Sequence, residues 1–323
     1  MLLSVEHLKT YFHTPRGVIK AVDDVSFSLN KGEVLGLVGE SGCGKSVTSQ
    51  SIMRLIPEPP GKIEGGKILF DGRDIASLPL KEMKSIRGNR ISMIFQEPMT
   101  SLNPVKTIGW QIGEMFRLHR NVSRKESIEM AVDMLAKVQI PEPAKRVRSF
   151  PHQLSGGMRQ RAMIAMALSC DPEILIADEP TTALDVTVQA QILDLMKRLS
   201  RDFNTAILMI THDLGVIADI ADRVMVMYAG KAVESASTGV IFKNPGHPYT
   251  RGLLGSVPVL GQSANYTGTR TRLNEIKGMV PSLSDLPEGC FFYPRCGQAD
   301  DLCKKRMPPL AEREEGHWVR CWH

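Results

Sequence analysis

The fold of this chain is decided by the stretch Val34-Leu35-Gly36-Leu37-Val38-Gly39-Glu40-Ser41-Gly42-Cys43-Gly44-Lys45-Ser46. Its first part, from Val34 to Val38, is an unbroken apolar run, which is typical of a β-strand covered on both faces. The second part, from Gly39 to Ser46, matches the P-loop pattern, a glycine-rich turn between a strand and a helix. Backbone N–H groups of such a turn converge on phosphate, and the helix N-terminus adds a partial positive charge. We therefore expect a nucleotide to bind at this turn.

The side chains of the P-loop have separate tasks. Lys45 is expected to reach the terminal phosphates as a point charge, and the Ser46 hydroxyl is expected to bind Mg²⁺. Cys43 occupies a free position of the pattern, so we interpret it as a small residue and not as a reactive thiol. The predicted nucleotide-binding residues of this segment are Gly39, Ser41, Gly42, Cys43, Gly44, Lys45, Ser46 and Val47.

A second predicted strand ends in two carboxylates, in the stretch Ile174-Leu175-Ile176-Ala177-Asp178-Glu179. Asp178 is expected to help hold Mg²⁺, and Glu179 is expected to accept a proton from an attacking water. A general base of this kind contributes roughly 10²–10⁴ in rate. An Asp-Glu pair at a strand end is common without any function, but together with the P-loop it predicts a nucleotide hydrolase.

Length and composition limit the class of protein. The 323 residues, of 35.7 kDa, suggest two domains or one large domain with an appendage. Apolar residues make up 42% and charged residues 23%, which argues against a disordered or fibrous chain. The net charge of +5 suits an anionic ligand or a membrane surface but is too small and dispersed to indicate nucleic acid. No apolar run approaches the roughly 18 residues needed to cross a bilayer, and the N-terminus lacks a secretion signal, so we expect a soluble chain.

The order of the predicted elements indicates an α/β fold. Residues 1–35 alternate between apolar and polar, which predicts half-buried antiparallel strands, and a helix is expected from Lys45 to about Leu55. Further apolar runs, with helical segments between several of them, predict a parallel sheet. These runs cover residues 91–95, 174–177, 206–210 and 224–227. Residues 97–167 have helical spacing and separate two of the strands, so we interpret them as a helical insertion.

A third motif lies at the start of a predicted helix and reads Leu154-Ser155-Gly156-Gly157-Met158-Arg159-Gln160-Arg161. From the local sequence alone, Ser155 is a helix N-cap, and the two glycines form either a loose turn or a second anion site. The motif resembles the signature loop in the ATP-binding subunits of ABC transporters. Three other motifs of that family are present in the family's order along the chain: Gln96 resembles the Q-loop glutamine, Ala183-Leu184-Asp185 the D-loop, and His212 the switch histidine.

This resemblance covers residues 1–240 and implies a P-loop NTPase (RecA-like) ABC ATPase core. The core would carry an N-terminal antiparallel β subdomain and the helical insertion at 97–167 as a helical subdomain. By the same resemblance, Glu179, His212 and Gln96 are catalytic, and Ser46, Gln96 and Asp178 hold Mg²⁺ around the bound ATP. An aromatic residue near the N-terminus is expected to stack on adenine, and we choose Phe12, with Tyr11 as the alternative.

The resemblance also implies a reaction chamber that two ATPase subunits share. The signature loop covers ATP bound to a second subunit, so two subunits close head-to-tail around two nucleotides, and hydrolysis reopens the pair. The residues predicted to contact the ATP of the second subunit are Gln153, Ser155, Gly156, Gly157 and Asp185. Residues 97–104, in the helical insertion, are expected to grip the cytoplasmic helices of membrane permeases.

The chain beyond about residue 240 has a different character. It is rich in turn formers, including residues 261–271, and is expected to be loop-rich with little core of its own. Four of the six cysteines lie here, at Cys290, Cys296, Cys303 and Cys321. In a chain expected to be cytosolic, they indicate a metal site more than disulfides or unligated thiols. Their spacing matches neither the short pairs of structural zinc sites nor the common ferredoxin runs, so zinc and iron–sulfur stay open on spacing alone.

Residues 244–254 and 290–296 resemble the C-terminal extension of ATPase subunits from dipeptide and oligopeptide importers. Some members of that family hold a [4Fe–4S] cluster in this extension, which favours the cluster over Zn²⁺ at the four cysteines. We expect a structural role for it, as a staple of residues 241–323, a C-terminal extension with little hydrophobic core. The aromatic residues expected to shield it are Phe291, Phe292, Trp318 and Trp322.

The expected function is that of an ATP-hydrolysing subunit of a di- or oligopeptide ABC importer. Its partners would be a second ATPase subunit, typically a paralogous chain, two transmembrane permeases and, indirectly, an extracytoplasmic substrate-binding protein, with no nucleic acid. The expected location is peripheral, on the cytoplasmic face of the inner membrane. Importers of nickel or another small solute share this layout and remain an alternative. A soluble ABC ATPase uncoupled from transport, and a regulatory subunit without turnover, are alternatives from other classes.

Overall fold

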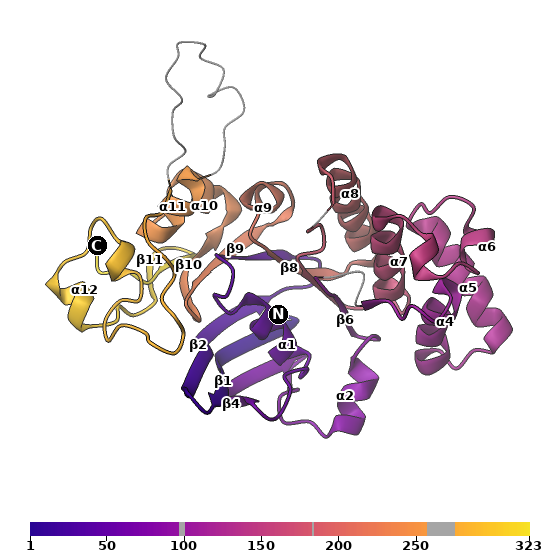
Figure 1. Cartoon of the computed structure of the whole chain (residues 1–323), viewed down its shortest axis with the longest axis horizontal. Coiled ribbons are helices and arrows are strands. Elements are labelled where there is room, and N and C mark those ends of the chain that lie inside the picture. The colour runs from indigo at the N-terminus through magenta and orange to yellow at the C-terminus, as the bar shows by residue number, and fades with distance from the viewer. Residues whose placement is uncertain (97–100, 183, 257–274) are drawn as a thin grey trace, which may run out of the picture. The chain divides into compact units, whose positions relative to one another are not determined.

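Figure 1 shows the computed structural model, which describes residues 1–96, 101–182, 184–256 and 275–323. The chain forms two compact units. The first unit comprises Met1–Leu3, Leu29–Val34 and Phe70–Ile210, and the second comprises Ser4–Ser28, Leu35–Leu69 and Thr211–His323. Among the described residues, no helix has both the length and the apolar character needed to span a membrane.

The N-terminal strands of the second unit form the predicted antiparallel arrangement. The sheet order is β2 (Gly17–Leu29), β1 (Leu3–Thr14) and β4 (Gly61–Phe70). A tight turn at Pro15 and Arg16 joins β1 to β2, so the two strands run in opposite directions. Their buried positions alternate along much of each strand, as the sequence pattern predicts.

The P-loop strand belongs to the other sheet of the second unit. β3 (Val34–Val38) is buried along its whole length and pairs in parallel with β9 (Arg223–Tyr228). β9 pairs antiparallel with β10 (Lys231–Ser237), β10 with β12 (His317–Val319), and β12 with β11 (Ala311–Glu314). The C-terminal segment therefore extends a sheet, whereas its sequence predicted loops.

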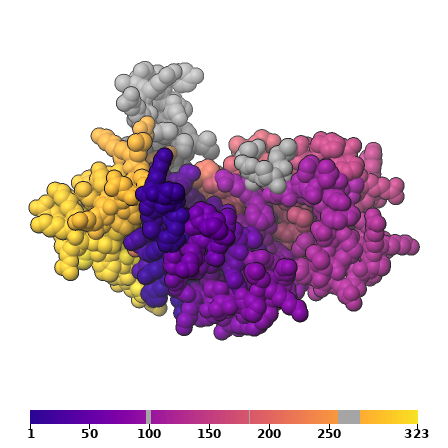
Figure 2. Space-filling view, turned by 60° about the horizontal axis from the view of Figure 1, so that its bottom comes forward, coloured from indigo at the N-terminus to yellow at the C-terminus, as the bar shows by residue number. Residues whose placement is uncertain are grey.

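The helices of the second unit are short, and their bounds are α1 (Lys45–Ile52), α9 (Leu214–Ile220), α10 (Thr238–Lys243), α11 (Pro248–Gly255) and α12 (Asp301–Lys305). α1 ends earlier than the expected Leu55, because Arg54 adopts a left-handed conformation with φ 50°. α9 packs closely on β3, since a Cβ atom on Gly36 would lie 2.7 Å from Cδ1 of Ile217. Figure 2 shows that the chain from residue 275 onwards gathers into one compact mass.

The first unit contains a parallel sheet of β6 (Ile91–Ile94), β7 (Ile174–Asp178) and β8 (Ala206–Thr211). β7 and β8 are buried throughout, which explains their continuous apolar sequences. The short strand β5 (Arg73–Asp74) and α2 (Leu80–Ile86) precede β6. The expected parallel α/β character of this region is confirmed.

The helical block between β6 and β7 is also confirmed. It consists of α4 (Ile108–His119), α5 (Arg124–Lys137), α6 (Pro143–Arg146), the 3₁₀ turn η1 (Pro151–Gln153) and α7 (Gly156–Leu168). α8 (Val186–Phe203) follows β7. Residues 97–100, at the start of the expected insertion, lie outside the described residues, as do Ala183 and the expected turn-rich segment 261–271. The division at residue 240 into an ATPase domain and a C-terminal extension stays a prediction.

Candidate functional site

The P-loop connects β3 to α1. Two of its positions require glycine because neighbouring backbone atoms lie too close for any side chain. Gly39 has φ 154° and Gly44 has φ 103°. A Cβ atom on Gly39 would lie 2.3 Å from the carbonyl oxygen of Met227, and one on Gly44 would lie 2.2 Å from that of Ala21. These distances are far below van der Waals contact, so any side chain here would push the loop away from its neighbours.

Lys45 points back across the loop. Its ammonium group donates hydrogen bonds to the carbonyl oxygens of Gly39, at 2.7 Å, and Glu40, at 3.1 Å. The residue is only 5% exposed. Gly44 occupies the N-cap position of α1, so no side chain from that position caps the first N–H groups of the helix. A buried cation above a glycine-rich helix start is a geometry suited to a polyphosphate.

Cys43 behaves as the sequence suggested. It is 1% exposed, and burial raises the pKa of its thiol above the ordinary value. The thiol therefore stays protonated near neutral pH, and a protonated, inaccessible thiol is a poor nucleophile. This arrangement agrees with its interpretation as a small packing residue.

Phe12 and Tyr11 lie on opposite faces of β1. The Tyr11 hydroxyl donates a 2.7 Å hydrogen bond to Asp23, and the Lys20 ammonium lies 5.7 Å from the ring centroid. The half-buried Phe12 ring packs over Gly61 instead, where a Cβ atom would lie 2.9 Å from the ring. Tyr11 is thus held by polar partners, which supports the choice of Phe12 as the adenine-stacking residue; the assignment stays a prediction.

The predicted general base contacts the predicted Q-loop glutamine. Oε2 of Glu179 accepts hydrogen bonds from Nε2 of Gln96, at 3.0 Å, and from Oγ1 of Thr182, at 2.9 Å. Glu179 adopts φ 47° and donates its N–H to the carbonyl of Ile210, so its side chain is held at the end of β7. Asp178, the last residue of β7, is 3% exposed. The sequence indicated Gln96 and Glu179, whereas Thr182 was missed because a single threonine carries no pattern.

The signature and D-loop residues lie at the starts of two neighbouring helices. Ser155 caps α7 by accepting a 3.4 Å hydrogen bond from the N–H of Met158. Asp185 caps α8 in the same way. The helices approach closely, since a Cβ atom on Gly157 would lie 2.9 Å from Val188. Most of the residues that are expected to contact a second subunit are exposed. These exposed residues are Gln153, Ser155, Gly156 and Asp185.

His212 follows β8 and is exposed. The next residue, Asp213, caps α9 through hydrogen bonds from the N–H groups of Gly215 and Val216. The P-loop and His212 belong to the second unit, whereas Gln96, Asp178 and Glu179 belong to the first. The roles of these residues stay predictions.

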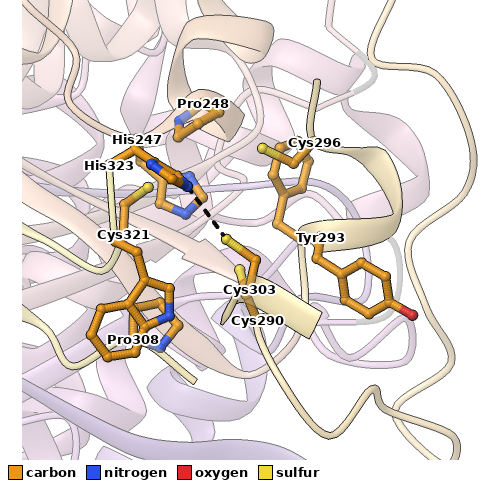
Figure 3. A pocket seen from close by; sticks show the side chains of 11 residues that line it. His247, Pro248, Cys290, Tyr293, Cys296, Cys303, Pro308, Cys321 and His323 are labelled. Atoms are coloured by element: carbon orange, nitrogen blue, oxygen red, sulfur yellow. Dashed lines mark hydrogen bonds between the residues drawn. The ribbon is translucent and has the colours of Figure 1, made fainter. Parts of the chain in front are cut away.

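The four cysteines of the C-terminal segment line one cavity (Figure 3). All four thiols are free of disulfide bonds. Burial raises the pKa of Cys290 to about 11 and also raises the pKa values of Cys296 and Cys303. The remaining lining residues are His247, Pro248, Phe292, Tyr293, Pro308, Trp322 and His323. Four thiols around one cavity with a mainly apolar wall form a donor set that fits a thiolate-bound metal group.

Two side chains at or beside this cavity, His323 and Asp300, were absent from the sequence prediction. His323 lies 3.7 Å from Sγ of Cys303 and 3.3 Å from Asp300, and these three groups are close enough to share an ion. Phe292 and Trp322 line the cavity as expected. Trp318, however, is 41% exposed and lines a separate pocket with Met225, so its expected shielding role is wrong.

A buried carboxylate fixes the C-terminal segment to β10. Glu234 is fully buried and accepts hydrogen bonds from the N–H groups of Gly246, at 2.6 Å, and His247, at 2.9 Å. Its Oε1 also lies 2.8 Å from Nε2 of His317. Burial lowers the pKa of His247 to about 3, so its ring is neutral, and Nδ1 accepts a hydrogen bond from the N–H of Tyr249. The network satisfies a buried charge and orders the chain that leads to the cysteines.

Comparisons with known proteins agree with these observations. Residues 22–182 match the family model described as "ABC transporter", and residues 233–303 match "Oligopeptide/dipeptide transporter, C-terminal region". A "Putative peptide import ATP-binding protein" of Brucella abortus (strain 2308) is 54% identical over 99% of this chain and 96% of its own length. The "Oligopeptide transport ATP-binding protein AppD" of Bacillus subtilis (strain 168) is 53% identical, with coverages of 99% and 96%.

A solved structure is similar as well. The dimeric structure of MJ0796, described as a bacterial ABC transporter cassette, aligns with a TM-score of 0.65 and 27% identity. The alignment covers 73% of this chain and 99% of that one. A second structure of the same cassette, in a post-hydrolysis state with ADP and Pi, aligns equally well.

Proposed function

Because the chain belongs to the ATP-hydrolysing subunits of ABC transporters, in the group with the oligopeptide/dipeptide C-terminal region, we propose that it powers peptide import. The expected α/β ABC fold agrees with the structural neighbours. The proposal that the cargo is a peptide rests on the match of residues 233–303 to the oligopeptide/dipeptide transporter C-terminal region. Relatives above 50% identity that are named for peptide transport support it as well.

The proposed reaction is hydrolysis of Mg·ATP. Lys45 would neutralise the terminal phosphates, and Ser46, Gln96 and Asp178 would hold the Mg²⁺ ion. Glu179 takes a proton from the attacking water. The water oxygen bonds to the γ-phosphorus, and the bond between the γ-phosphorus and the bridging β-phosphate oxygen breaks. The contact between Glu179 and Gln96, at 3.0 Å, supports this assignment because it holds the carboxylate in a fixed direction. His212 contacts the γ-phosphate.

ATP acts in this proposal by binding more tightly to a closed head-to-tail dimer than to the open one. The exposed starts of α7 and α8 offer N–H donors and the Ser155 hydroxyl to the ATP of the second subunit. Loss of the γ-phosphate removes that bridge, and the dimer reopens. The related cassette MJ0796 has a dimeric structure, which supports this arrangement.

The subunit is proposed to attach peripherally to the cytoplasmic face of the membrane through two permeases, opposite a paralogous ATPase. Expressed with its neighbouring permeases, the chain should co-purify with both and drive ATP-dependent dipeptide uptake into vesicles. Uptake of Ni²⁺ but not peptide would favour the small-solute alternative. Full ATP hydrolysis without any stable permease complex would contradict a transport role.

The four cysteines are proposed to hold a [4Fe–4S] cluster, which would staple the segment 290–321 together. Chain purified under anaerobic conditions should be brown, and Cys296→Ser should remove both the colour and the bound iron. Iron and zinc analysis of the same samples provides the measurement. A colourless anaerobic preparation with one bound zinc would contradict the cluster and establish the zinc alternative.

A further inference from the structure

Two residues of the chain beyond residue 240 form hydrogen bonds with Glu40 of the P-loop. Every polar group of Glu40 has a partner: its N–H donates to the hydroxyl of Tyr249, at 2.8 Å, and its carbonyl accepts from Lys45, at 3.1 Å. Its carboxylate accepts two hydrogen bonds from Arg295, at 2.7 and 3.0 Å. Tyr249 and Arg295 both come from the chain beyond residue 240. We call Glu40, Tyr249 and Arg295 the Glu40 latch.

Arg295 is firmly placed for this contact. It ends the 3₁₀ turn η3 (Tyr293–Arg295), immediately before Cys296, and its side chain is 4% exposed. Its guanidinium lies 5.8 Å from the ring centroid of Tyr228 and 5.9 Å from that of Phe292. It also donates to the carbonyl oxygens of Ile276 and Lys277. A guanidinium fixed on so many sides presents a rigid fork to a carboxylate.

The pair has an electrostatic consequence for the phosphate site. Glu40 places a negative charge on the same loop that must bind a triphosphate, and its carbonyl shares the Lys45 ammonium. An uncompensated carboxylate there would repel the phosphates, because like charges at short range in a partly buried site interact strongly. The bidentate contact with Arg295 cancels that charge. Arg295, Tyr249 and the Glu40 side chain take no part in the proposed hydrolysis steps.

We propose that Arg295 is a positioning residue of the nucleotide site, which neutralises Glu40 and links ATP binding to the order of the cysteine loop 290–296. The proposal rests on ATP binding at the P-loop, as proposed above. Coupling between two sites is reciprocal, so a loop that favours ATP binding is itself stabilised by ATP. In this proposal residues 290–296 act on the nucleotide site through the charge pair between Arg295 and Glu40.

Nucleotide affinity tests the electrostatic part. With the full-length chain and a fluorescent ATP analogue, Arg295→Ala should raise the dissociation constant about tenfold, since it exposes the phosphates to the Glu40 charge. Glu40→Gln should bind as tightly as the unaltered chain or more tightly. The double variant should return to within about twofold of the unaltered chain, because the repelling charge is gone. Lys304→Ala, which removes an exposed cation of the same module, serves as the control and should have no effect.

Two results would overturn the latch. One is an Arg295→Ala dissociation constant within about twofold of the unaltered chain; the other is a double variant as weak as Arg295→Ala, which would indicate mere damage to the fold. Arg295→Lys keeps the charge but loses the fork, and it should weaken binding less than alanine. Failure of the unaltered chain to bind the analogue would instead contradict the proposed function.

Hydrogen exchange tests the reciprocal part without measuring activity. The N–H groups of Cys290, Arg295 and Cys296 are hydrogen-bonded within the module, so their exchange reports its opening. ATP should slow exchange across residues 290–296 in the unaltered chain, and this protection should be lost in Glu40→Gln. Equal protection by ATP in both chains would contradict the link.

Discussion

Glu179→Gln is expected to lower the rate of ATP hydrolysis by roughly 10²–10⁴ while leaving ATP binding intact. The amide matches the carboxylate in size but cannot accept a proton from water. Its oxygen can still accept a hydrogen bond from Gln96 or Thr182, so the local structure should persist. Phosphate release measures the rate, and size-exclusion chromatography with light scattering measures the oligomeric state.

The same variant should accumulate as an ATP-bound dimer, because the closed state forms but its γ-phosphate is not removed. Glu315→Gln makes the same chemical change in an exposed turn of the C-terminal hairpin and should behave as the unaltered chain. Unchanged hydrolysis in Glu179→Gln would refute the assigned role of this carboxylate. A strictly monomeric variant in saturating ATP would count against closure driven by the nucleotide.

The parts of the site that the sequence predicted are contiguous motifs. The bounds of β3 agree with the apolar run from Val34 to Val38, because a strand buried on both faces leaves no polar position. Gly39 and Gly44 lie where backbone carbonyls approach within 2.3 Å of a would-be Cβ atom, so the glycines of the pattern have a steric cause. The contact between Gln96 and Glu179 follows from the ends of adjacent parallel strands, β6 and β7.

The parts that the sequence missed depend on pairs far apart in the chain. Glu40 and Arg295 are separated by 255 positions, and Glu234 and His317 by 83, so no local spacing reveals either pair. β11 was missed for another reason: all its residues are exposed, and it therefore has no apolar alternation. Arg54 ended α1 early through its backbone conformation, which the helical pattern does not encode.

Ser155→Arg is expected to reduce ATP hydrolysis by roughly 10²–10³ without weakening ATP binding to the P-loop of the same chain. Ser155 is exposed, and its capping hydrogen bond is long, at 3.4 Å, so loss of this hydroxyl should cost the fold no more than about 1 kcal/mol. A large loss of turnover would therefore mean that the arginine keeps the start of α7 away from the ATP of the partner subunit. Binding of a fluorescent ATP analogue and phosphate release in the purified complex separate the two quantities.

Ser123→Arg is the matched control, because Ser123 is also an exposed serine N-cap, on α5, with a hydrogen bond from Glu126 at 3.2 Å. Loss of either cap should cost about 1 kcal/mol of stability, so the two variants should unfold at similar denaturant concentrations. Only Ser155→Arg should lose hydrolysis, since only the start of α7 is proposed to complete a second subunit's site. If both variants hydrolyse ATP at the unaltered rate, or if a dilute monomer does so, each chain must contain a complete reaction site of its own.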